Sequence, residues 1–145
     1  MAGDLPGWRE KKELLWGEKA GAEERIRGGE AFAAAGRLPE ALDFYERAQH
    51  AEGIREVLRA AVEQGDLYLF KRCRDLLGGD LRGELAALAR NALRKGKVLF
   101  AVRAARALGD EALAAEALEK ARKVFPDSQI LVKQLEEEQG PPAGT

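Results

Sequence analysis

Residues 29–48 read GEAFAAAGRLPEALDFYERA, and this stretch decides the fold of the chain. Gly36 and Pro39 interrupt a helical pattern, and Pro39 stands where the first turn of a helix tolerates proline. After the interruption, apolar residues recur at the spacing of an amphipathic helix: Ala41, Leu42, Phe44, Tyr45 and Ala48. The stretch therefore predicts two helices joined by a tight turn.

This hairpin resembles a tetratricopeptide repeat. The pattern of that family has a small residue and then an aromatic residue on the first helix, a glycine at the turn, and alanine, an aromatic residue and alanine on the second. The matching residues are Gly29, Phe32, Gly36, Ala41, Tyr45 and Ala48. A second match, at the spacing from turn glycine to closing proline, consists of Gly109, Ala114, Leu118, Ala121 and Pro126. The resemblance implies stacked helical hairpins with a groove that binds extended peptides or helices.

Composition and spacing agree with an all-α protein. The chain has 145 residues, of which 46% are hydrophobic and 34% charged, and good helix formers dominate while β-branched residues are scarce. Turn glycines at positions 36, 65 and 96 are spaced by 29 and 31 residues, a quasi-period of helical hairpins. This spacing predicts repeated antiparallel hairpins, with about eight helices plus a short N-terminal helix, and the resemblance implies that they form a right-handed α-solenoid.

Glycine and proline positions divide the chain further. Residues 1–17 are expected to form a capping segment, residues 18–139 the repeat domain and residues 140–145 a flexible tail. Besides the second helix of the 29–48 hairpin, helices are expected at 8–16, 22–35, 54–64, 67–77, 81–95, 97–108, 111–125 and 128–138. The apolar residues expected to cover the end of the solenoid are Leu5, Trp8, Leu15 and Trp16.

Three glycines inside this plan carry specific expectations. Gly28 and Gly29 weaken a helix, and we expect them to let a neighbouring helix approach closely. Gly53 is expected to separate the hairpin from the next helix.

The place of helix 97–108 among the hairpins can be assigned in two ways. Counted from Gly96, it is the second helix of a hairpin, whereas counted from Gly109 it is the first, and the sequence leaves both alternatives open.

Few residues could support catalysis or hold a cofactor. One cysteine excludes an internal disulfide and a cysteine-based zinc site, and no phosphate-binding glycine motif is present. Cys73 is interpreted as a small buried residue, and His50 is expected at the C-terminal end of a helix, where the helix dipole favours its charged form. We therefore expect no catalytic residue, no metal site and no cofactor. No apolar run suits a signal peptide or a membrane span, so a cytoplasmic location is expected.

Charge is distributed unevenly along the chain. Residues 1–52 carry 8 basic and 11 acidic side chains, residues 53–108 carry 12 and 6, and residues 109–145 carry 4 and 8. The middle segment therefore has a net charge of +6, between segments of −3 and −4. A basic middle between acidic ends is the main indication of a partner.

Arginines supply most of this positive charge. Helical phase from the 29–48 hairpin places Arg55, Arg59, Arg90 and Arg94 on the groove wall, and Arg103 and Arg106 join them if helix 97–108 is the first of a hairpin. Because guanidinium groups pair with carboxylates in a bidentate manner, we predict a non-catalytic scaffold that binds an acidic or carboxylate-ended segment of a partner protein. The alternative interpretation is a solubilising face, although Arg55 and Arg59 would then form a like-charge pair.

Two other functions remain open. The same basic face could bind nucleic acid, or acidic and basic segments of different copies could pair in a homo-oligomer. Against nucleic acid stand the overall pI of about 6.0 and the aromatic residues of the basic segment. Tyr68, Phe70 and Phe100 fall in apolar phase, and we expect them in the core rather than on a stacking surface.

Overall fold

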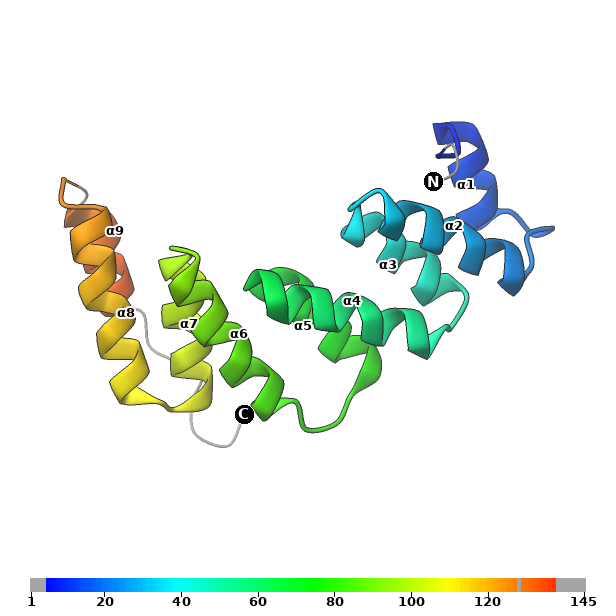
Figure 1. Cartoon of the computed structure of the whole chain (residues 1–145). Helices are drawn as coiled ribbons and strands as arrows, with labels where there is room; N and C mark the ends of the chain where they lie inside the picture. Colours follow the sequence, from blue (N-terminus) through cyan, green and yellow to red (C-terminus); the bar gives the residue numbers. More distant parts are fainter. Residues whose placement is uncertain (1–4, 128, 138–145) are drawn as a thin grey trace. The chain divides into compact units, whose positions relative to one another are not determined.

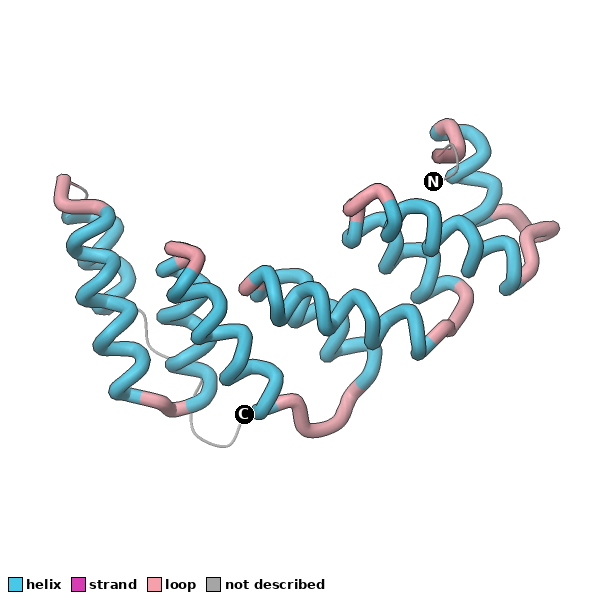
Figure 2. Tube along the Cα trace, in the orientation of Figure 1, coloured by secondary structure: helices cyan, strands magenta, loops and turns pink. Residues whose placement is uncertain are grey.

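The computed structural model describes residues 5–127 and 129–137, and within them it contains nine α-helices and no strand (Figure 1). The helices are α1 Trp8–Trp16, α2 Ala22–Ala34, α3 Leu38–Arg47, α4 Ala51–Gln64, α5 Leu67–Leu77, α6 Arg82–Arg94, α7 Val98–Leu108, α8 Glu111–Val124 and α9 Gln129–Glu137. Figure 2 shows that short loops join consecutive helices. The predicted all-α class is confirmed for these residues, whereas the tail at 140–145 lies outside them.

The chain forms two compact units. The first takes the described residues of 1–60 together with 71–79, and the second takes 61–70 together with the described residues of 80–145. Both α4 and α5 are therefore shared, since each contributes one part to either unit. Each unit has a core of its own.

The core of the first unit is the predicted hairpin, now α2 and α3. Phe32 of α2 stacks on Phe44 of α3, with ring centroids 5.4 Å apart and an interplanar angle of 21°. Tyr45 is only 1% exposed, and Ala41 and Leu42 are also buried. Gly36 has a φ of 77°, a left-handed conformation that other residues rarely adopt. The hairpin expected from residues 29–48 is confirmed.

Gly28 and Gly29 allow α2 and α3 to approach closely. A Cβ atom at Gly28 would lie 2.8 Å from the Phe44 ring, and one at Gly29 would lie 2.5 Å from Cε1 of Tyr45. Glycine lowers the helix propensity of α2 by about 1 kcal/mol per residue relative to alanine. Glycine is nevertheless required at both positions, because the rings of Phe44 and Tyr45 occupy the space that a side chain would need.

Gly53 does not separate two helices, contrary to the expectation. It is buried inside α4, which begins three residues earlier than expected, at Ala51 rather than at 54. The chain instead turns at Gln49, which has a φ of 52°. A Cβ atom at Gly53 would lie 2.7 Å from the Tyr45 ring, so this glycine also makes room for an aromatic side chain.

The expected position of His50 is likewise wrong. It lies beyond the end of α3 and directly before α4, where its carbonyl oxygen accepts a hydrogen bond from the Ile54 N–H at 3.1 Å. Its ring is 5.5 Å from that of Tyr45. His50 therefore lies at the N-terminal end of α4 and not at a helix C-terminus. Cys73, by contrast, is fully buried as expected.

Helix α1 packs against α2 and α3. Of the apolar residues expected to cover the end of the solenoid, Leu15 is buried, whereas Trp8 and Trp16 are 71% and 64% exposed. Arginine side chains fix the C-terminal half of α1: Arg25 donates to the carbonyl oxygen of Leu14, and Arg47 donates to that of Leu15, both at 2.8 Å. The two indoles therefore remain on the surface.

The core of the second unit centres on α7, which packs against both α6 and α8 (Figure 1). Helix α7 thus pairs with α6 across the turn at Gly96 and with α8 across the turn at Gly109. Small residues permit this: Ala101, Ala104 and Ala105 are completely buried. Gly96 and Gly109, which end α6 and α7, have φ values of 77° and 75°.

Stability at alkaline pH should depend on Tyr45. Burial, and then the charges of Glu56 and Glu30, raise the pKa of Tyr45 to about 12 from its ordinary value of 10. Its neutral form stabilises the fold fully below pH 10, and this contribution is lost as the pH rises toward 12. We expect the free energy of unfolding of the wild type to fall by about 1–3 kcal/mol more than that of Tyr45→Phe over this interval. Urea denaturation at a series of pH values measures this difference, and parallel curves for the two proteins would contradict it.

Candidate functional site

The six arginines predicted for the groove lie on both compact units. Arg55 and Arg59 are on the part of α4 that belongs to the first unit. The second unit holds the other four, with Arg90 and Arg94 on α6 and two on α7, Arg103 and Arg106. The six arginines therefore form two groups, one on each unit.

The arginines of α4 share an acidic neighbour. Arg55 lies 3.6 Å and Arg59 lies 3.8 Å from the carboxylate of Glu52, and all three side chains are exposed. The carboxylate reduces the repulsion that the sequence predicted between the two arginines. Exposed pairs of this kind contribute little to stability, and here they also weaken the positive field that a partner would meet.

The α6–α7 hairpin, residues 82–108, is strongly basic, and we call it the basic hairpin. It has one acidic side chain, Glu84, in the first turn of α6 and so at the opposite end of that helix from Arg94. Seven side chains are basic: Arg82, Arg90, Arg94, Lys95, Lys97, Arg103 and Arg106. No acidic residue lies in the first turn of α7, and no side chain caps that helix, so its N-terminus adds to the positive potential.

Neutral groups, rather than carboxylates, accept hydrogen bonds from three of these seven cations. Arg82 donates to the carbonyl oxygen of Leu108 at 2.7 Å, and Arg94 donates to the side-chain oxygen of Asn91. Lys97 donates to the carbonyl oxygen of Gln64 at 2.7 Å. Apart from Arg103, which has a partner of its own, no cation of the basic hairpin forms an ion pair with a carboxylate of the described residues.

Arg90 and Arg94 are the members of the predicted set that this hairpin exposes most fully. Both are exposed, whereas Arg103 and Arg106 are partly buried. The Nη1 atom of Arg106 is buried and has no hydrogen-bond partner among the described residues. An exposed guanidinium without a carboxylate partner can form a bidentate pair with an incoming carboxylate.

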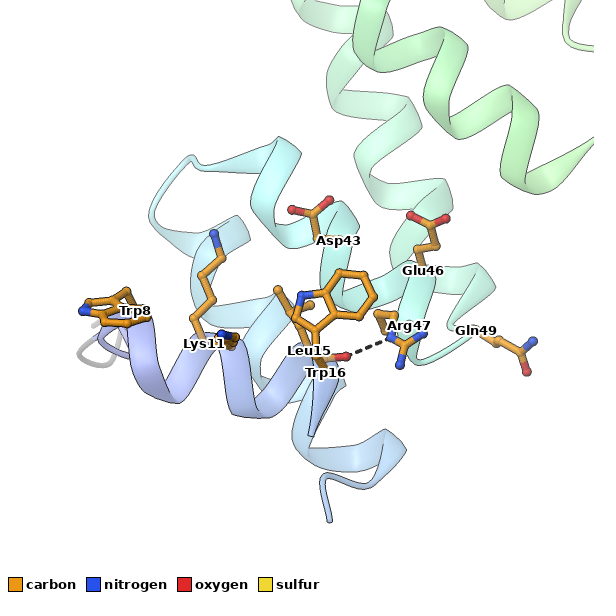
Figure 3. Close-up of a pocket in the computed structure, with 9 residues that line it drawn as sticks. Trp8, Lys11, Leu15, Trp16, Asp43, Glu46, Arg47 and Gln49 are labelled. Carbon is orange, nitrogen blue, oxygen red and sulfur yellow. Dashed lines mark hydrogen bonds between the residues drawn. The ribbon is translucent and has the colours of Figure 1, made fainter. Parts of the chain in front are cut away.

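A cavity of about 610 Å³ lies in the first unit beside α1 (Figure 3). Its lining residues are Trp8, Lys11, Lys12, Leu15, Trp16, Asp43, Glu46, Arg47 and Gln49. Figure 3 shows the Trp16 ring beside Arg47, whose guanidinium lies 4.7 Å from the ring centroid. Neither tryptophan was predicted as a site residue, although two indoles on one short polar helix were the available signal.

Most charged groups of this cavity already have partners inside the fold. Arg72 lies 2.9 Å from the carboxylate of Asp43 and 3.8 Å from that of Glu46. Lys11 forms an ion pair with Glu40 at 2.8 Å. Together with the hydrogen bond from Arg47 to the Leu15 carbonyl oxygen, these contacts hold α1 and α5 against α3. The polar lining therefore has a structural use, and the basic hairpin is the better candidate for binding.

One expectation about the aromatic residues is wrong. Tyr68, which the sequence placed in the core, is 64% exposed, and its ring meets that of Phe100 edge-on at a centroid distance of 5.4 Å. Its neighbours Leu67 and Phe70 are buried, so Tyr68 lies off the buried stripe of α5. Phe70 is buried as expected, whereas Phe100 is partly exposed.

Neither a metal-binding cluster nor a membrane-spanning helix is present among the described residues. No group of three or more His, Cys, Asp and Glu side chains in this part of the chain could hold a metal ion. No helix there is long and apolar enough to cross a membrane. Comparisons of the chain with protein-family models, with curated proteins and with solved structures gave no match.

Proposed function

We propose that this chain is a non-catalytic protein-interaction module that binds an acidic segment of a partner protein through the basic hairpin. The observation that carries the proposal is the excess of cations on residues 82–108, together with the exposure of Arg90, Arg94 and Lys95, which form no ion pair with a carboxylate of the described residues. Such groups form charge-assisted hydrogen bonds with a ligand without first losing an internal ion pair. The exposed pair Arg90 and Arg94 would make the first contacts, and the cytoplasm is the proposed location.

The proposal includes a TPR-like, right-handed α-solenoid as the scaffold. Two features support it: the turn glycines Gly36, Gly65 and Gly96 all have a positive φ, and α7 packs against both of its neighbours. Repeats that bury their apolar faces only against adjacent repeats pack in this way. A scaffold of this type presents successive helices to one extended ligand.

A protein partner suits the charge distribution better than nucleic acid does. The basic segment 53–108 lies between segments with net charges of −3 and −4. A long polyanion would pass these acidic segments, whereas a short acidic peptide can meet the basic hairpin alone. The overall net charge of −1 also differs from the basic balance of most nucleic-acid-binding domains.

Charge reversal of the basic hairpin should remove the partner. The immobilised wild-type protein is compared with Arg90→Glu/Arg94→Glu in affinity capture from a lysate of the cells that produce it. Reversing two exposed cations replaces attraction with repulsion, so we expect the amount of captured partner to fall by about tenfold or more. Quantitative mass spectrometry measures the captured proteins, and circular dichroism verifies that the variant is folded.

The matched control is Lys19→Glu/Arg27→Glu, which changes the net charge equally at exposed positions of the first unit. A partner retained by this control and lost from Arg90→Glu/Arg94→Glu supports the proposal. Equal capture by all three proteins would contradict it. Salt-sensitive recovery of nucleic acid alone would favour the nucleic-acid alternative, and recovery of the chain itself alone would favour self-assembly.

A further inference from the structure

An apolar hollow of about 200 Å³ opens beside the turn of the basic hairpin. Its lining comes from the α6–α7 turn, the first turn of α7 and the C-cap residue of α8: Gly96, Lys97, Val98, Leu99, Phe100 and Phe125. Leu99, Phe100 and Phe125 are all partly exposed, so each presents apolar surface to solvent. The ammonium group of Lys97 is held by the Gln64 carbonyl oxygen, which leaves an apolar lining.

Further exposed apolar surface adjoins the hollow. On the α5 side, the exposed Tyr68 ring meets Phe100 edge-on. Contiguous exposed apolar surface of this kind often marks a site of interaction.

Positive charge adjoins the hollow without nearby acidic residues on the same hairpin. Arg94 and Lys95 end α6 directly before Gly96, and both are exposed. Neither forms an ion pair with a described carboxylate. Glu84, the acidic residue of the basic hairpin, lies at the other end of α6. The same edge of the unit thus combines an apolar hollow with exposed cations that have no carboxylate partner among the described residues.

We propose that this hollow receives one apolar side chain, phenylalanine or leucine, of the partner segment, while acidic residues on either side of it pair with Arg94 and Lys95. The inference rests on the proposed function and adds the anchor residue that the partner must contain. Arginine and lysine contacts steer the acidic segment and set its orientation, and burial of the anchor supplies affinity that salt does not screen.

A second copy of the chain fits this surface less well. The acidic run near the C-terminus contains one apolar residue, Leu135, followed by Glu136 and Glu137. Leu135 is only 1% exposed, so a second copy would have to release it from its own core before it could serve as the anchor.

Two synthetic peptides test the inference on the wild-type protein. One is Asp-Glu-Phe-Glu-Asp, capped at both ends, and the other replaces its phenylalanine with alanine. Isothermal titration calorimetry should show that the phenylalanine peptide binds about tenfold or more tightly, because only it can fill the hollow. Equal affinity of both peptides, with binding lost in Arg90→Glu/Arg94→Glu, would overturn the anchor and leave the proposed function standing. Absence of binding by either peptide would count against both.

Substitutions in the protein provide a test of the anchor site that is independent of the peptide comparison. Leu99→Gln places a polar amide at the hollow and should reduce binding of the phenylalanine peptide to the affinity of the alanine peptide. Val124→Gln, a similar change at an exposed position outside the lining, should leave the tenfold preference intact.

Binding of an oligothymidylate but of neither peptide would overturn the inference in favour of nucleic acid. The molecular mass in solution could instead rise with concentration for the wild type but not for Leu99→Gln. That result would assign the hollow to a second copy of the chain and would also overturn the inference.

Discussion

Replacing Tyr45 with alanine is expected to lower the free energy of unfolding by about 3–5 kcal/mol. The side chain is only 1% exposed, and its ring fills the space beside two helical glycines, Gly29 on α2 and Gly53 on α4. The backbones of α2 and α4 cannot close the space that the ring leaves. Tyr45→Ala therefore loses the burial of the ring and also the van der Waals contacts of the residues that line the resulting cavity. Urea denaturation followed by circular dichroism measures the loss.

Tyr68→Ala is the matched control for this change. Tyr68 is 64% exposed, and its one ring contact is the edge-on approach to Phe100. We expect a loss below about 1 kcal/mol, in the range of exposed substitutions and single aromatic contacts. Similar losses for the two tyrosine variants would contradict the central role of Tyr45 in the first unit.

Gly29→Ala is expected to destabilise the protein by about 1–3 kcal/mol, although alanine is the better helix former. The new methyl group would lie 2.5 Å from Cε1 of Tyr45, and 2.8 Å from Cδ1 of the same ring. The ring is buried, so it can move aside only by displacing its neighbours. The gain in helix propensity, about 1 kcal/mol, is smaller than this strain.

The control for propensity alone is Gly83→Ala in α6. Nothing lies within 4 Å of a Cβ atom at Gly83, which is exposed. This substitution should therefore stabilise the protein by about 0.5–1 kcal/mol. A stabilising effect of Gly29→Ala as well would show that α2 and α3 are not in close contact at this point.

A double-mutant cycle then identifies the source of the strain. When Tyr45 is already alanine, the methyl group at position 29 enters space that the ring has left. We expect Gly29→Ala to be neutral or stabilising in that background, with a coupling free energy of about 1–3 kcal/mol. Additive effects of the two substitutions would place the cost of Gly29→Ala elsewhere in the fold.

Local patterns account for the parts of the fold that the sequence predicted correctly. Apolar spacing set the helices, and glycines with a positive φ, such as Gly36 and Gly96, set the turns between them. Both signals act within a few residues and do not depend on distant contacts. Most helix boundaries therefore agree with the prediction to within about one residue, as in α5.

The sequence-based predictions are wrong at residues whose position depends on contacts with parts of the fold that local spacing does not reveal. Gly53 was interpreted as a helix breaker, but it lies within α4 because the Tyr45 ring occupies the space of a side chain. His50 was placed at a helix C-terminus, since the early start of α4 could not be seen. Tyr68 was placed in the core, because apolar phase alone does not distinguish the buried stripe of a helix from its border.

The amino-acid sequence by itself determined the helical class, the hairpin at residues 29–48 and the basic character of the middle segment, because composition and short-range spacing encode all three. Only the tertiary structure decided which cations have acidic partners: Glu52 approaches Arg55 and Arg59, whereas Arg90 and Arg94 meet no carboxylate among the described residues. It also brought Leu99 and Phe125 together, because α7 and α8 pack side by side. Charge is a property of each residue, but its neutralisation and the shape of a hollow depend on contacts between residues far apart in the chain.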